Sequence, residues 1–183
     1  MTIGVFIAFL FLTAVDVLIS VRFVRTNNKA YLAATVFAWL PFALYLLAVY
    51  LFDLAIPDYV LYIVVAAQFI RTFFGYYLDW YEKTGFFDRS IHAYGCFAYA
   101  LLVFCTIRSV LGAVLPKLVA AFFVLTIGMT VGVLIEIVEF ALDSRKKKIG
   151  IRLQKGLRDT DFDLIFDTIG SFAAGVFAYF TLL

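Results

Sequence analysis

Residues 118–141 read LVAAFFVLTIGMTVGVLIEIVEFA, a run that carries no charge before Glu136. A helix of this length is long enough to cross the roughly 30 Å hydrocarbon core of a bilayer. Five further apolar runs of similar length lie at about 3–21, 31–52, 59–78, 90–108 and 163–183. The sequence therefore predicts an all-α, polytopic integral membrane protein, in which residues 1–183 form a single transmembrane domain with a six-transmembrane-helix bundle.

The composition of the whole chain supports this class. Of its 183 residues, 65% are hydrophobic and 15% are charged, and the mean hydropathy is +1.02. Soluble domains average about 45–50% apolar and about 25% charged residues. A net charge of +2 without a solvated basic face excludes nucleic acid as a partner, because a phosphate backbone is bound through many Lys and Arg contacts. Membrane lipids are the expected surroundings.

Basic residues are concentrated in alternate connections between the predicted helices. The first, third and fifth connections hold nearly all Lys and Arg, including the run Arg145–Lys148, whereas the second and fourth hold only Lys117, with Arg108 beside it. Short loops rich in Lys and Arg stay on the cytoplasmic side. The sequence thus predicts a basic cytoplasmic loop at 142–162 and two extracytoplasmic termini.

Acidic residues gather in the predicted cytoplasmic half, and helical spacing aligns several of them with small residues. In the run 118–141, Gly128 and Gly132 share a face with Glu136 and Glu139. Three other aligned sets are Gln68, Arg71, Gly75 and Asp79; Asp88 and His92; and Asp163, Asp167, Gly170 and Ala174. Small residues let neighbouring helices approach closely, so we expect these faces to pack together.

This packing would bring a set of ionisable side chains into one buried pocket open to the cytoplasm. Its expected members are Arg71, Asp88, His92, Glu136, Glu139, Asp163 and Asp167. Each ionisable group at a helix centre costs roughly 2.5–3.5 kcal/mol, so such groups commonly mark function. A purely structural interpretation stays open, in which Arg71 pairs with a carboxylate and fastens two helices. Asp16, Asp79, Glu82 and Asp143 are expected to reach interfacial water.

Two of these segments carry a family resemblance. Asp88-Arg89-Ser90-Ile91-His92 resembles the D-[KR]-x-x-H motif of VanZ-like membrane proteins, and Glu136-x-x-Glu139 followed by the run 161–170 resembles their acidic closing motif. The closing run is nearer to the YjdF-like branch, with Phe162 as its aromatic residue. The resemblance covers about residues 68–175 and implies a polytopic protein of the plasma (inner) membrane of a prokaryote. It implies little chemistry.

The residue types themselves indicate hard-metal chemistry. Several carboxylates with one imidazole suit Mg²⁺, Mn²⁺ or Fe²⁺, and we expect Glu136, Glu139, Asp163 and Asp167 to hold such a cation. A single histidine excludes bis-histidine haem ligation, and the sequence shows no nucleotide-binding motif.

The leading hypothesis is a divalent-metal-dependent enzyme that acts on a lipid or lipid-linked phosphate. In it Arg71 faces the phosphate, and His92, oriented by Asp88, serves as general base. One alternative is a proton- or cation-coupled transporter or flippase, which a homodimer could complete. Another is a structural or regulatory membrane partner whose polar core only fixes helix packing.

Overall fold

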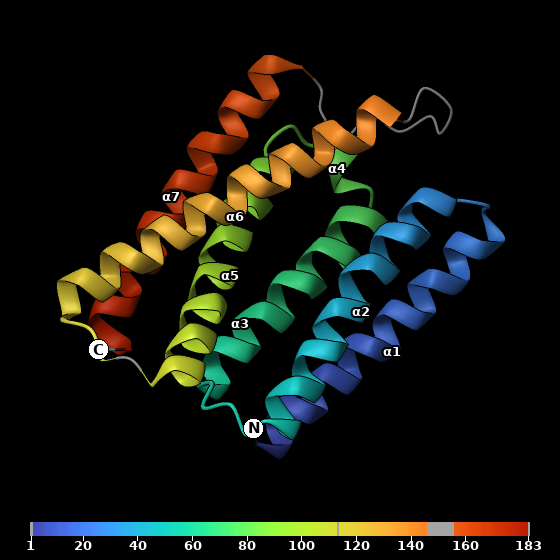
Figure 1. Cartoon of the computed structure of the whole chain (residues 1–183). Coiled ribbons are helices and arrows are strands. Elements are labelled where there is room, and N and C mark those ends of the chain that lie inside the picture. Colours follow the sequence, from blue (N-terminus) through green and yellow to red (C-terminus); the bar gives the residue numbers. More distant parts are fainter. Residues whose placement is uncertain (1, 113, 146–155, 183) are drawn as a thin grey trace. The chain divides into compact units, whose positions relative to one another are not determined.

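The computed structural model describes residues 2–112, 114–145 and 156–182, and over these residues the chain is helical with no strands (Figure 1). Within this described part of the chain, six helical segments are long and apolar enough to cross a membrane. The elements are α1 (Ile3–Arg25), α2 (Lys29–Leu51), α3 (Asp58–Phe69), the π-helix η1 (Ile70–Tyr77), α4 (Trp80–Lys83), α5 (Phe87–Leu111), α6 (Lys117–Arg145) and α7 (Leu157–Thr181). The prediction of an all-α polytopic membrane protein is confirmed.

The last two helices are longer than the apolar runs that predicted them. Helix α6 continues to Arg145 and α7 begins at Leu157, so both extend into the segment expected as the loop 142–162. The prediction ended these helices where the apolar runs end, at 141 and 163, although Leu and Arg in the two extensions are good helix formers. Asp159 in the first turn of α7 also favours an early start, because a negative charge complements the positive end of the helix dipole. Residues 146–155 of the expected loop lie outside the described residues.

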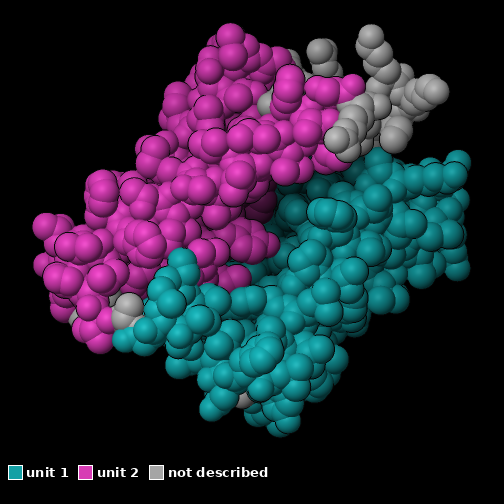
Figure 2. Space-filling model, viewed as in Figure 1, with its two compact units in different colours: residues 1–87, 105–112 teal, residues 88–104, 113–183 magenta. Residues whose placement is uncertain are grey.

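The chain separates into two compact units, which we describe one at a time (Figure 2). Unit 1 comprises residues 1–87 and 105–112, and unit 2 comprises residues 88–104 and 113–183. Helix α5 contributes to both units. The orientation of the helices in the membrane and the single transmembrane domain stay predictions.

Unit 1 buries Asp16, an acidic residue that was expected to reach interfacial water. In it α1 packs against α2 and α3, and Trp39 Nε1 donates a hydrogen bond of 3.0 Å to Thr13 Oγ1. Asp16, one turn further along α1, is only 6% exposed, and the hydroxyl of Thr72 donates to its carboxylate. The expectation that Asp16 reaches the interface is therefore wrong. Its place on the face of α1 that packs inward keeps it from water.

The third span departs from α geometry after Phe69. In η1 the backbone bonds run from residue i+5 to residue i, as in the 3.0 Å bond from Leu78 N to Phe73 O. The chain then turns at Asp79, which has a φ of 60°. The aligned face predicted for Gln68, Arg71, Gly75 and Asp79 assumed α spacing throughout, so it does not hold beyond Arg71. At the start of η1, Arg71 still reaches Gln68 on α3, because its Nη2 donates to Gln68 Oε1 at 3.2 Å.

Unit 2 is held together by the small-residue faces that the sequence predicted. The Gly128 and Gly132 positions on α6 face the side chains of Ser171 and Asp167 on α7. Gly170 on α7 lies directly against the backbone carbonyl of Ala93 on α5, so a methyl group there would have no room. These contacts let α5, α6 and α7 pack closely. The close packing sets the distances between the polar residues of unit 2.

Candidate metal centre

The polar residues of unit 2 meet at one end of its helices. Helices α5 and α7 begin at this end and α6 finishes there (Figure 1). The sequence brings them together because the ionisable residues lie early in α5 and α7 and late in α6. His92, Glu136, Asp163 and Asp167 are all buried. The convergence predicted from spacing is present for the members that belong to this unit.

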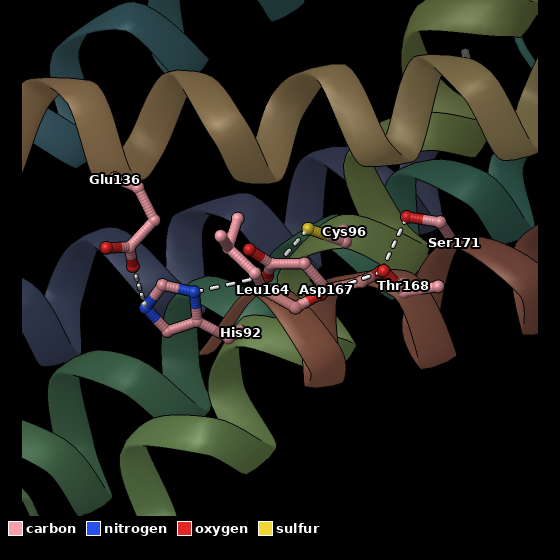
Figure 3. A network of polar contacts seen from close by, with 7 residues as sticks. All are labelled: His92, Cys96, Glu136, Leu164, Asp167, Thr168 and Ser171. Carbon is pink, nitrogen blue, oxygen red and sulfur yellow. Dashed lines mark hydrogen bonds and ion pairs between the residues drawn. The ribbon is translucent and has the colours of Figure 1, made fainter. Parts of the chain in front are cut away.

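His92 lies between two carboxylates (Figure 3). Its Nδ1 is 3.1 Å from Asp167 Oδ1, and its Nε2 is 4.0 Å from Glu136 Oε1. The shorter distance is a hydrogen bond, and it assigns the ring proton to Nδ1 when the imidazole is neutral, because a carboxylate only accepts. The lone pair of Nε2 then points toward Glu136. That is the arrangement in which histidine commonly binds metals.

Asp167 is fixed in place by residues from all three helices. Cys96 Sγ donates to Asp167 Oδ1 at 3.1 Å, and Ser171 Oγ donates to the backbone carbonyl of Asp167 at 2.6 Å. The other oxygen, Oδ2, is buried against Gly132 and has no hydrogen-bond partner among the described residues. Asp167 therefore has one oxygen committed to His92 and Cys96, and it acts as the residue that orients the imidazole.

The first group with metal-ligand spacing is His92, Glu136 and Glu139. One ligand atom from each residue lies within 4.8 Å of the others. Ligands of one metal ion at bond lengths of about 2.0–2.2 Å stand roughly 3–4.4 Å apart, so small side-chain movements would close this group around an ion. The set offers one imidazole nitrogen and two carboxylates.

The second group is Asp88, Asp159 and Asp163. Their carboxylates also place one oxygen each within 4.8 Å of the others. Asp88 and Asp159 stand in the first turns of α5 and α7, and Asp163 follows one helical turn after Asp159. This group offers only oxygen ligands.

The predicted site residues thus divide between these arrangements. Glu136 and Glu139 fall in the first group with His92, Asp163 falls in the second group with Asp88, and Asp167 bonds to His92. The carboxylate on His92 Nδ1 is Asp167 rather than the predicted Asp88. Arg71 belongs to unit 1, where its guanidinium lies 5.8 Å from the Tyr76 ring. Its predicted role at a phosphate stays a prediction.

Two residues of the site were not singled out in the sequence. They are Cys96, which donates to Asp167, and Asp159, which belongs to the second group. Each lies four residues from a predicted site residue, Cys96 after His92 and Asp159 before Asp163, so each shares a helical face with it. That spacing was the available signal.

Two arginines flank an aromatic ring at the same end of unit 2. The guanidinium of Arg89 lies 4.1 Å from the centre of the Phe162 ring, and that of Arg158 lies 5.7 Å from it. Arg89 Nε is buried and has no hydrogen-bond partner among the described residues. Both arginines come from the starts of the helices that also carry the aspartates, so cationic and anionic groups lie near one another.

Comparison with known proteins agrees with the membrane architecture. An uncharacterized protein from Thermotoga maritima is 35% identical over 126 residues, a match that covers 68% of this chain and 64% of the length of that relative. No solved structure is significantly similar to the chain. The family described as predicted membrane protein (DUF2238) matches residues 5–183. The likeness to VanZ-like and YjdF-like proteins stays a resemblance of motifs. With nearly its whole length matched, the chain belongs to the DUF2238 family of predicted membrane proteins.

Proposed function

We propose that the protein is a divalent-metal-dependent membrane enzyme that acts on a lipid or lipid-linked phosphate. The observation that supports this most is the hydrogen bond between Asp167 and His92, which directs Nε2 toward Glu136 in a group completed by Glu139. Carboxylate–histidine pairs of this kind orient metal ligands in many metalloproteins. A core built only for packing does not need an imidazole whose free nitrogen faces a buried carboxylate.

The ligand set suits a metal that accepts both oxygen and nitrogen. One imidazole with carboxylates fits Mn²⁺ or Fe²⁺, and also Zn²⁺, whereas Mg²⁺ binds imidazole poorly. In this assignment His92 is a ligand through Nε2, so it replaces the general-base role that we expected for it. A bound divalent cation would supply charge stabilisation to a reacting phosphoryl group.

The groups around the ligands support a lipid phosphate as the substrate class. Arg89 and Arg158 offer guanidinium groups suited to phosphate oxygens, and they stand at the starts of α5 and α7. Large apolar side chains of α6 are exposed beside Glu136, among them Ile137 and Val138. A lipid tail could lie along that face while its phosphate meets the polar end of the unit.

The first experiment is metal analysis of the purified full-length protein in nanodiscs. Bound metal is measured by mass spectrometry, and thermal stability is followed after chelation and after addition of Mn²⁺, Fe²⁺, Zn²⁺ or Mg²⁺. We expect Glu139→Gln to lower the Mn²⁺ occupancy of the group of His92, Glu136 and Glu139. Asp143→Asn is the matched control, because Asp143 lies on the same helix, is also half-buried and belongs to neither group.

Activity is then measured as Mn²⁺-dependent release of phosphate from nanodiscs that contain phosphatidic acid or polyprenyl phosphates. We expect release from the wild type and the control, and at least a tenfold loss in Glu139→Gln. Absence of metal, with no stabilisation by any of the ions, would contradict the proposal. Cation flux in liposomes that disappears in Glu139→Gln, without phosphate release, would replace the enzyme by a transporter.

A further inference from the structure

The three aspartates of the second group come from the starts of two helices. Asp88 is on α5, Asp159 and Asp163 are on α7, and one oxygen of each lies within 4.8 Å of the others. We propose that these aspartates bind a second divalent cation through oxygen ligands alone. This site goes beyond the proposed function and stands on ligands that the first group does not use.

Helix electrostatics explains only part of this cluster. Acidic residues in the first turn of a helix are stabilised by the helix dipole, and Asp88 and Asp159 are in such turns. Asp163 lies one turn further in and is only 3% exposed. The dipole effect falls off within the first turn, so the burial of Asp163 needs another cause.

Asp163 is the member of the group that points to a ligand. Its Oδ1 is buried and has no hydrogen-bond partner among the described residues. A buried carboxylate oxygen without a partner is costly, and buried charges are normally paired or bound to metals. Since Asp163 also supplies an oxygen to the cluster, a cation bound there would remove that cost.

The charges around Asp163 favour the same conclusion. The carboxylate of Asp163 is repelled by those of Asp88, Asp159 and Glu136, and it is attracted by His92. A divalent cation held between Asp88, Asp159 and Asp163 would offset two of these negative charges. This repulsion is a second reason to expect a cation between the three aspartates.

The two groups should differ in which metals they retain. The aspartate group has only carboxylate oxygens, which suit Mg²⁺, Ca²⁺ and Mn²⁺. The group of His92, Glu136 and Glu139 includes a nitrogen ligand, which favours Mn²⁺ over Mg²⁺. Excess Mg²⁺ should therefore displace Mn²⁺ from the aspartates first.

The test is a Mn²⁺ titration of the full-length protein in nanodiscs, with bound metal counted by mass spectrometry and followed by electron paramagnetic resonance. We expect about two Mn²⁺ per wild-type chain, and about one after addition of excess Mg²⁺. Asp159→Asn should bind about one Mn²⁺, which Mg²⁺ does not displace. Glu139→Gln should also bind about one, which Mg²⁺ does displace.

Asp161→Asn is the matched control, because Asp161 lies on the same helix between the two ligands, is exposed and belongs to neither group. It should behave as the wild type does. A wild type that binds a single Mn²⁺ which excess Mg²⁺ does not displace, or an Asp159→Asn variant with unchanged occupancy, would overturn the second site. If Asp159→Asn fails to fold, Mg²⁺ competition on the wild type decides, and release of neither or of both ions overturns the proposal. Unchanged occupancy in Glu139→Gln alone would count against the first group and leave the second in place.

Discussion

Asp167 on α7 holds the imidazole of His92 on α5, with Oδ1 3.1 Å from Nδ1. The contact joins two helices that come into backbone contact where Gly170 meets Ala93, the residue next to His92. It also fixes which nitrogen of the ring is exposed to Glu136. The close approach of the two helices and the chemistry of the site therefore depend on the same few residues.

Replacing Asp167 by Asn should weaken metal binding while keeping the shape of the side chain. The amide is neutral and can present either its oxygen or its NH₂ group to Nδ1, so it no longer selects the tautomer of His92. Loss of such an orienting carboxylate typically costs 10–100-fold in metal affinity. Isothermal titration of Mn²⁺ into nanodiscs that hold the variant measures this. Cys96→Ser should retain affinity within about threefold, because the hydroxyl can still donate to Asp167. Unchanged affinity in Asp167→Asn would contradict the orienting role.

Metal affinity should fall as the pH falls. His92 must be neutral to bind a metal through Nε2, and the carboxylates of Glu136 and Glu139 must be ionised. Protons compete with the cation for each ligand, so the affinity for Mn²⁺ increases as the pH rises. We expect the dissociation constant for Mn²⁺ to rise by at least tenfold between pH 8 and pH 6. A constant that does not depend on pH would show that these residues are not the ligands.

Gly170→Ala should destabilise unit 2, because the added methyl group meets the carbonyl of Ala93. Overpacking of this kind typically costs about 1–3 kcal/mol, and it should lower both the thermal midpoint and Mn²⁺ affinity. Gly95→Ala is the control, since its position on α5 has open space around it. That change should be neutral or slightly stabilising, because Ala is the better helix former. Equal destabilisation by both variants would argue against a close contact at Gly170.

The predicted orientation can be read from the two ends of α6. Val114 precedes this helix and is 94% exposed, and Ser144 is exposed near its end. Cysteines placed at these positions in intact cells should react differently with an impermeant maleimide, with Val114→Cys labelled and Ser144→Cys protected until lysis. The native Cys96 and Cys105 are buried and should react slowly. The reverse pattern would place both termini in the cytoplasm.

The lengths of the apolar runs and the spacing of residues within each run were sufficient to predict much of the architecture. The six spans follow from apolar runs, and Gly128, Gly132 and Gly170 lie at close contacts because small residues recur at helical intervals. The partner of His92 was assigned wrongly, since spacing relates residues along one helix and points to Asp88. Which residue of a neighbouring helix reaches across is set by rotation and packing, which no single-helix pattern contains.

Asp16 is a second residue whose surroundings could not be predicted from the pattern of a single helix. Its distance from the end of α1 indicated access to water, but exposure depends on which way the helix face turns. In unit 1 that face packs inward, and Asp16 meets Thr72 of η1. A π-helix leaves no clear mark in hydropathy, so neither the contact nor the wider turns of η1 could be predicted from the apolar run.

The π-helix at Ile70–Tyr77 has a consequence for how this span can change length. In an α-helix, deleting one residue rotates every later side chain by about 100°, which would turn a packed face toward lipid. Within η1, removing one residue closes the wider turns into α turns, and the residues beyond keep their direction. Members of the family with a third span one residue shorter should therefore carry the gap between 70 and 77.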